Sequence, residues 1–202
     1  MKQSGNKNIC VFCGASAKAD THYYELARAC GQIIAAQGYG LVYGGGGTGL
    51  MGACAGAARD AGGSVLGIIP EFLIARERQL SGIEQIIVKT MRERKQLMLD
   101  NSDGFLVLPG GIGTLEEAIE ILSWLRLHLH DKPMVFVDGN GYWAPLMQLL
   151  HHTIKTGFAP EWLADHFLYE KTPKAALKAL EHHWQNPRPK GEIDVRPETD
   201  MV

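Results

Sequence analysis

The chain has 202 residues, of which 46% are hydrophobic and 21% charged, the profile of an ordinary globular protein with a full core. Its formal net charge of -2 gives no electrostatic reason to expect a nucleic acid or an anionic membrane surface as a partner. No apolar run approaches the roughly 20 residues that a membrane-spanning helix needs, and residues 1–7 lack the apolar core of a signal peptide. We therefore expect one cytoplasmic domain over residues 1–185 and a flexible tail over residues 186–202.

The hydrophobic pattern alternates between strand and helix along the whole chain. The expected strands are short apolar runs at 8–13, 40–43, 64–69, 85–88, 103–108 and 133–137, with an edge strand at 167–169. The expected helices are 21–37, 50–61, 90–101, 114–129, 142–156 and 173–184. Short apolar strands that alternate with helices predict an α/β fold, with a doubly wound and mainly parallel sheet that has helices on both faces.

The cysteines and histidines give no pattern that predicts a metal site. Cys10 and Cys13 have C-x-x-C spacing, but positions three apart in a strand point to opposite faces of the sheet. With Cys30 and Cys54 they are expected to be buried, unreactive thiols. The paired histidines lie in or near helices at spacings that do not share a face, and are expected at the surface: His128 and His130, His151 and His152, His182 and His183.

Three of the expected strands end in glycine-containing loops, at 14–16, 44–49 and 109–114, and ligands of such folds bind at the carboxyl ends of the strands. The second loop matches the dinucleotide fingerprint G-x-G-x-x-G, and Glu71 stands where a ribose-binding acid would. That fingerprint usually follows the first strand of its unit, whereas this loop follows the second. The match therefore favours an NAD(P) enzyme only weakly.

The most informative run extends from Pro109 to Glu117, at a junction between a strand, a glycine loop and a helix. The free amides and dipole of a helix start favour an anion there. Thr114 and Glu117 also have capping-box spacing, but capping explains neither the proline nor the three glycines. A phosphate cradle with an adjacent carboxylate explains the whole run. Glu116, about 100° away around the helix, is expected to face solvent.

A second helix begins with another capping box, Thr90 and Glu93. Arg94 and Lys95 follow on the methionine-bearing side of this helix. Basic residues in this place are compatible with a solvated face and equally with a phosphate partner in a cleft.

Taken together, these runs resemble the Lonely Guy (LOG) family of cytokinin riboside 5′-monophosphate phosphoribohydrolases. The family's P-G-G-x-G-T-x-x-E motif is matched in full by Pro109–Glu117. Its M-H-x-R-K motif is matched by Met91, Arg94 and Lys95, with Arg92 in place of the histidine. The runs 11–16 and 43–52 are also similar to the family, and the likeness covers residues 8–180.

The resemblance implies a Rossmann-like fold and hydrolysis of the N-glycosidic bond of a nucleoside 5′-monophosphate, either a cytokinin riboside 5′-monophosphate or AMP. It also implies a homodimer or higher homo-oligomer, and with the absence of a metal-ligand pattern we expect no cofactor and no metal. It assigns catalysis to Glu117, beside the sugar, and to Arg94, at the nucleotide. The substrate-binding residues that it implies are Gly14, Ser16, Gly46, Thr48, Met91, Lys95, Gly110, Gly111, Gly113 and Thr114.

Other functional classes compete with this interpretation. Family members have often been labelled lysine decarboxylases, but that chemistry normally needs pyridoxal phosphate on a lysine, and no feature of the chain argues for one. Related glycine-loop proteins include molybdenum-cofactor carriers, so a nucleotide-binding or carrier protein without hydrolysis is the main alternative. Arg94 and Glu117 together favour the enzyme, because a carrier needs neither. The sequence does not separate adenine from a prenylated adenine as the base.

Overall fold

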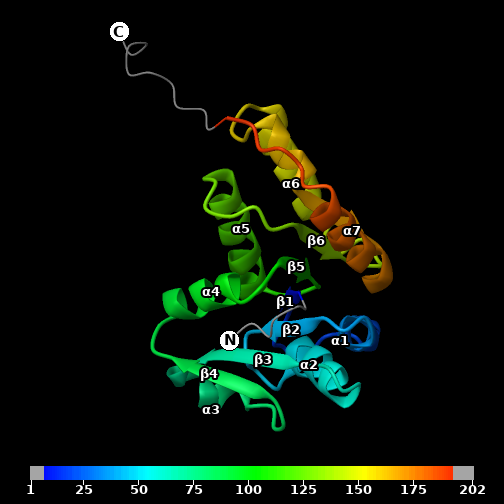
Figure 1. Cartoon of the computed structure of the whole chain (residues 1–202), viewed down its shortest axis with the longest axis vertical. Coiled ribbons are helices and arrows are strands. Elements are labelled where there is room, and N and C mark those ends of the chain that lie inside the picture. The colour runs from blue at the N-terminus through cyan, green and yellow to red at the C-terminus, as the bar shows by residue number, and fades with distance from the viewer. Residues whose placement is uncertain (1–6, 193–202) are drawn as a thin grey trace.

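The computed structural model describes residues 7–192, and its strands form one parallel sheet in the order β4-β3-β2-β1-β5-β6-β7 (Figure 1). Each pair of neighbouring strands runs parallel. The predicted doubly wound α/β fold is confirmed. The strands are β1 (Asn8–Phe12), β2 (Gly40–Tyr43), β3 (Val65–Pro70), β4 (Glu84–Val88), β5 (Gly104–Val107), β6 (Met134–Val137) and β7 (Phe167–Glu170).

Helices cover both faces of this sheet, as the alternating pattern predicts. Helices α1, α2 and α7 pack on one face, and α4, α5 and α6 pack on the other. Short 3-10 turns at Glu71–Leu73 and Glu161–Asp165 complete the connections. The helices are α1 (Thr21–Ala36), α2 (Gly49–Asp60), α3 (Ile74–Glu77), α4 (Met91–Asp100), α5 (Ile112–Arg126), α6 (Ala144–Lys155) and α7 (Pro173–Gln185).

The two faces of the sheet bury separate hydrophobic layers. In β1, Ile9 and Val11 face the layer under α1, α2 and α7, whereas Cys10 and Phe12 face the layer under α4, α5 and α6. Cys13 lies in the first layer, so the two cysteines of the C-x-x-C run point to opposite faces. All four cysteines are buried free thiols, as expected.

Two histidines contradict the prediction that the paired histidines lie at the surface. His130 is only 8% exposed; its Nε2 lies 2.9 Å from the carbonyl oxygen of Ile121, and its Nδ1 accepts a hydrogen bond from the amide of Lys132. Burial lowers the pKa of His130 to about 4, so the ring is neutral at pH 7. His183, on α7, is also buried. Helical spacing alone could not show that the segments around residues 130 and 183 pack inward.

The two ends of the chain fall partly outside the described residues. Residues 186–192 follow α7, and here Arg188 bonds to Asp165 and Lys190 Nζ donates to the carbonyl oxygen of His130 at 2.6 Å. The rest of the predicted tail, 193–202, and the N-terminal residues 1–6 are not described. Between residues 7 and 192, no helix has the length and apolar character needed to cross a membrane.

The strand order reverses between β1 and β5, because β1 leads outward to β2 and β5 leads to β6 on the other side. A crevice opens at such a switch point, at the carboxyl ends of the strands. Here the loops after β1 and β5 meet, and the amide of Gly14 donates to the carbonyl oxygen of Pro109 at 3.1 Å. The hydroxyl of Thr48 also donates to the carbonyl oxygen of Ala15, so the fold brings all three predicted glycine loops into direct contact.

Candidate active site

A cavity of about 480 Å³ occupies this switch point, a size that suits a small organic ligand. The glycine loops after β1 and β5 form its centre, and helices α1, α2, α3, α4 and α5 and the segment before α6 supply the other walls. The lining residues are Cys13, Gly14, Ala15, Ser16, Lys18, Ala19, Tyr23, Leu50, Met51, Glu77, Arg94, Pro109, Gly110, Gly111, Gly113, Thr114, Glu117 and Tyr142.

Helix α5 begins two residues earlier than predicted, at Ile112, with Gly111 as its N-cap and no side-chain cap. The capping-box interpretation of Thr114 and Glu117 is therefore wrong, because both residues lie inside the helix. The first helical hydrogen bond runs from the amide of Leu115 to the carbonyl oxygen of Gly111. The amides of residues 112–114 precede that bond, so they form the anion-binding end of the helix.

The segment that precedes α6 braces the loop after β5. Tyr142 donates its hydroxyl to the carbonyl oxygen of Gly110 at 2.7 Å, and Trp143 donates its indole N–H to the carbonyl oxygen of Val107 at 3.2 Å. The buried carboxylate of Asp138 accepts the amides of Asn140 and Trp143 at 2.7 Å each. This network fixes the carbonyl groups of the loop and leaves its amides available to a ligand.

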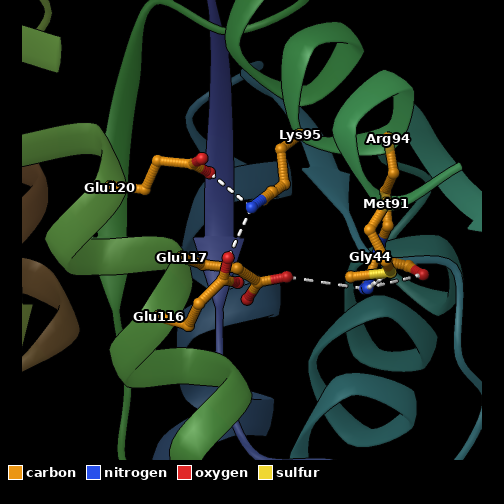
Figure 2. A network of polar contacts seen from close by, with 7 residues as sticks. All are labelled: Gly44, Met91, Arg94, Lys95, Glu116, Glu117 and Glu120. Atoms are coloured by element: carbon orange, nitrogen blue, oxygen red, sulfur yellow. Dashed lines mark hydrogen bonds and ion pairs between the residues drawn. The ribbon is translucent and has the colours of Figure 1, made fainter.

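Arg94 enters the cavity from α4, where Thr90 caps the helix by accepting the amide of Glu93, as predicted. Its side chain is 7% exposed, and Nη2 donates to the carbonyl oxygen of Gly44 at 3.2 Å (Figure 2). Nη1 lies 3.9 Å from the sulfur of Met91, and Nε is buried without a hydrogen-bond partner. The guanidinium is thus held in place but retains unused donors, which is costly unless a ligand accepts them.

Glu117 faces Arg94 from the second turn of α5, with 3.6 Å between Oε1 and Nη2 (Figure 2). Burial raises the pKa of this carboxyl to about 7, against the opposing effect of Arg94 and with smaller increases from Glu116 and Glu77. A carboxyl whose pKa lies near 7 can both accept and release a proton at physiological pH.

The neighbouring charges on the same two helices are arranged differently. Lys95 forms ion pairs with Glu116 Oε1 and, at 2.7 Å, with Glu120 Oε2 (Figure 2). Burial lowers the pKa of Lys95, but the hydrogen bonds and charges of its two partners outweigh that effect and raise it. This cluster joins α4 to α5 beside the cavity. Glu116 is half-exposed, close to the expectation that it faces solvent.

Most of the residues predicted for the site come together in the cavity: Gly14, Ser16, Arg94, Gly110, Gly111, Gly113, Thr114 and Glu117. Three other predicted residues do not line the cavity themselves but contact residues that do. Gly46 leaves space for Glu77 and Met51, Thr48 donates its hydroxyl to the carbonyl oxygen of Ala15 at 3.2 Å, and Met91 touches Arg94. Lys95 is engaged by the two glutamates, and its role as a phosphate contact stays a prediction.

Sequence reasoning missed four polar residues of the cavity: Lys18, Tyr23, Glu77 and Tyr142. Lys18 and Tyr142 follow β1 and β6, so the rule that ligands bind at the carboxyl ends of strands could have found them. Tyr23 packs edge-on against Tyr142, with 5.6 Å between ring centroids. Glu77 follows the end of β3 by seven residues, in a polar stretch that gave no clear pattern.

Solved structures share this fold. The molybdenum cofactor carrier protein of Chlamydomonas reinhardtii superposes with a TM-score of 0.70 over 90% of this chain and 100% of its own, at 18% identity. The molybdenum cofactor binding protein of Rippkaea orientalis gives a TM-score of 0.66 over 89% of this chain and 98% of its own, at 20% identity. At such low identity the likeness concerns the fold alone.

Sequence relatives are much closer. The family model described as "Possible lysine decarboxylase" matches residues 51–180. The cytokinin riboside 5′-monophosphate phosphoribohydrolase of Rhodococcoides fascians is 40% identical over 86% of this chain and 89% of its own length. The cytokinin riboside 5′-monophosphate phosphoribohydrolase LOG3 of Arabidopsis thaliana is 36% identical over 91% of this chain and 86% of its own. With both LOG motifs at the walls of one cavity, the chain belongs to the LOG family of Rossmann-like proteins.

Proposed function

We propose that this protein hydrolyses the N-glycosidic bond of a nucleoside 5′-monophosphate and releases the free base and ribose 5-phosphate. The observation that carries the proposal is the placement of Glu117 and Arg94. Both are buried in one cavity, where Glu117 lies one helical turn beyond the free amides of α5 and Arg94 faces it from α4. The names of the relatives support the same reaction.

In this proposal the 5′-phosphate lies against the amides of residues 112–114 and the glycines before them. Glycines allow a phosphate to approach the backbone closely, and the helix dipole favours its charge. Gly14, Ser16 and Lys18 flank this position from the loop after β1. Lys18 supplies a cationic side chain there, whereas the ammonium of Lys95 already has two carboxylate partners.

The sugar then lies beside Glu117. Cleavage of the bond between ribose and base develops positive charge on the sugar, as in glycoside hydrolysis. The Glu117 carboxylate stabilises that charge and accepts a proton from the attacking water. Arg94 holds the carboxylate in position through the 3.6 Å contact and directs its unused donors at the nucleotide.

The natural substrate is AMP, a cytokinin riboside 5′-monophosphate, or both. We further propose that the protein works in the cytoplasm, which its four free thiols support, since a reducing compartment keeps thiols free.

The protein also assembles, in this proposal, as a homodimer or larger oligomer through the outer face of α5. Ile112 and Ile119 on α5 and Leu127 at its C-cap expose 81%, 41% and 44% of their surface, and association would cover these apolar side chains. Sedimentation of the wild type and of the double variant Ile112→Glu/Ile119→Glu tests this assembly.

The decisive test of the reaction is incubation with AMP and, separately, isopentenyladenosine monophosphate, followed by detection of free base and ribose 5-phosphate. The ratio of kcat/KM for the two substrates identifies the preferred base. Adenosine, which lacks the phosphate, serves as the matched control and should react far more slowly.

A variant tests the role of Arg94. Arg94→Ala should lower kcat by about 10²-fold, because it removes a fixed charge from a water-poor site. A change in KM alone would instead make Arg94 a uniform binding residue.

The alternative is a carrier that binds a nucleotide without cleaving it. The fold shared with the molybdenum cofactor carriers is compatible with it, but a carrier has no use for the buried Arg94–Glu117 pair. Tight binding of AMP or of isopentenyladenosine monophosphate without release of either base would favour the carrier and reject the hydrolase.

A further inference from the structure

The cavity contains a second carboxyl group, Glu77, at the C-terminal end of the short helix α3. Its Oε2 atom is buried and has no hydrogen-bond partner. A buried carboxylate oxygen without a donor is unfavourable, so such a group is expected to be protonated or to meet a ligand. Among the described residues that line the cavity, Glu77 and Glu117 are the only carboxylic acids.

The glycine loop after β2 holds Glu77 in this place. The amide of Gly47 donates to the carbonyl oxygens of Glu77 and Arg78, at 2.8 and 2.5 Å, and Gly46 pairs with Gln79 in an isolated antiparallel bridge. A Cβ atom on Gly46 would lie 2.7 Å from Glu77 Oε2, and one on Gly47 would lie 2.5 Å from the carbonyl oxygen of Arg78. The glycine loop 44–49, which matches the dinucleotide fingerprint, therefore holds the turn that carries Glu77 in place.

The charge of Glu77 interacts with the charges of Arg94 and Glu117. Burial raises the pKa of Glu77, and Arg94 offsets this only in part. The charge of Glu77 in turn contributes to the raised pKa of Glu117. The charge of Glu77 also adds, after burial, to the raised pKa of the Tyr43 hydroxyl on β2. The charge of Arg94 thus acts on both carboxyl groups, and protonation of one of them removes their mutual repulsion.

Hydrolysis of an N-glycosidic bond needs two proton movements, one from water and one to the departing base. Glu117 performs the first. Arg94 cannot perform the second, because a guanidinium stays charged in proteins. In the proposed pose the helix amides and Lys18 hold the phosphate, whereas Glu77 reaches the cavity from the connection after β3, with its Oε2 close to Gly46. If the phosphate and sugar lie as proposed, the base lies on the side of Glu77.

We propose that Glu77, in its protonated form, is the general acid that donates a proton to a ring nitrogen of the leaving base. This inference rests on the proposed hydrolase function. As the bond between C1′ and the base nitrogen breaks, its electron pair goes to the base, which takes the proton of Glu77. The oxygen of water bonds to C1′ and passes one proton to Glu117. Net transfer of one proton from Glu117 to Glu77 through solvent restores the starting state, so water is the only co-reactant.

The test compares a leaving group that needs a proton with one that does not. Glu77→Gln should lower kcat for AMP by about 10²-fold or more, the usual contribution of general acid catalysis. With 4-nitrophenyl ribofuranoside 5-phosphate, whose nitrophenolate leaves as an anion, the loss should be at least about tenfold smaller. Glu117→Gln should be impaired on both substrates. Glu77→Gln should also remove the alkaline limb of kcat/KM with AMP, because that limb reports the acid.

Controls separate this role from a structural one. Glu71→Gln, at an exposed position in the same connection, should behave as wild type. Glu77→Asp keeps the acid and should retain more activity on AMP than Glu77→Gln, while thermal unfolding of both variants checks the fold. Equal losses on the two substrates, or an unchanged alkaline limb with AMP, would overturn the proposal. Failure of the wild type to release base from AMP or isopentenyladenosine monophosphate would instead reject the hydrolase function itself.

Discussion

Two groups of opposite charges connect α4 to α5, and they differ although their residues are adjacent in sequence. Arg94 and Glu117 are 7% and 10% exposed and stand 3.6 Å apart, with guanidinium donors left unused. Lys95 meets two carboxylates, Glu116 and Glu120, which are 48% and 29% exposed. Because successive residues of a helix are rotated by about 100°, one step along each helix moves the charges from the cavity to its outer edge.

The difference indicates that the Lys95 cluster stabilises the fold, whereas the Arg94–Glu117 pair is available to a ligand. A buried ion pair at long range is poor stabilisation, since desolvation costs more than the contact returns. The Lys95 cluster is close, partly hydrated and has two partners, so it is suited to hold the helices together. The buried Arg94–Glu117 pair leaves guanidinium donors without acceptors, and a bound substrate would supply those acceptors.

The largest expected effect separates the adjacent glutamates of α5. Glu117→Gln removes the carboxylate that stabilises the sugar cation and should lower kcat for AMP by about 10³-fold. Glu116→Gln, one residue earlier and at the outer edge, should change kcat by less than about twofold. Release of adenine in a steady-state assay measures both. Parental turnover in Glu117→Gln would show that the carboxylate has no catalytic role.

The second prediction concerns stability. The unfolded chain releases the Glu117 proton near pH 4.5, whereas the folded protein keeps it up to about pH 7, so the free energy of unfolding falls as the pH rises through this window. Glu117→Gln abolishes that fall and should be more stable than wild type by about 3 kcal/mol above pH 7, with no gain below pH 4.5. Urea denaturation at pH 4.5 and pH 8 tests the sign. An equal difference at both pH values would contradict the raised pKa.

The third prediction displaces Arg94 without mutating it. A Cβ atom on Gly44 would lie 1.9 Å from Nη2 of Arg94, so Gly44→Ala must move the guanidinium. We expect kcat for AMP to fall about tenfold while the fold persists, because a displacement of about 1 Å in an active site is costly. Gly56→Ala is the matched control, since a Cβ atom at that helical position meets open space. Equal activity of the two variants would mean that the position of Arg94 is unimportant.

The smallest effect belongs to Lys95. Lys95→Ala should lower the free energy of unfolding by about 1 kcal/mol or less, as partly exposed ion pairs do. Its KM for AMP should change by less than about threefold, because the ammonium is already paired with Glu116 and Glu120. A much larger rise in KM would support the phosphate contact that the family resemblance implies, and would require the cluster to open when substrate binds.

Much of this arrangement was predictable because it depends on local pattern. The apolar strands and the glycine loops at their ends follow from spacing and from the geometry of a parallel sheet. The roles of Arg94 and Glu117 were implied by the resemblance to the LOG family. The start of α5 was not predictable from propensity. Gly111 and Gly113 are poor helix formers, so the pattern favoured a start at Thr114, whereas the helix begins at Ile112 and Gly113 lies within its first turn.

The features that sequence reasoning missed depend on contacts between distant segments. Glu77 reaches the cavity because its carbonyl oxygen accepts the amide of Gly47, thirty residues earlier in the chain. His130 is buried because the segment after α5 folds back so that its ring meets the carbonyl oxygen of Ile121. Neither contact has a periodicity or a motif, so neither leaves a local signal.

The early start of α5 fixes the distance between the amides proposed to bind the phosphate and the carboxylate proposed to act on the sugar. The first free amide, at Ile112, and the carboxylate of Glu117 belong to one helix, which rises about 7.5 Å between them. A rigid helix sets that length, and side-chain truncation cannot alter it. Insertion of a single alanine after Thr114 would rotate the carboxylate by about 100° and lengthen the step by about 1.5 Å. Turnover of the nucleotide would then be lost through geometry, with every contacting group still present.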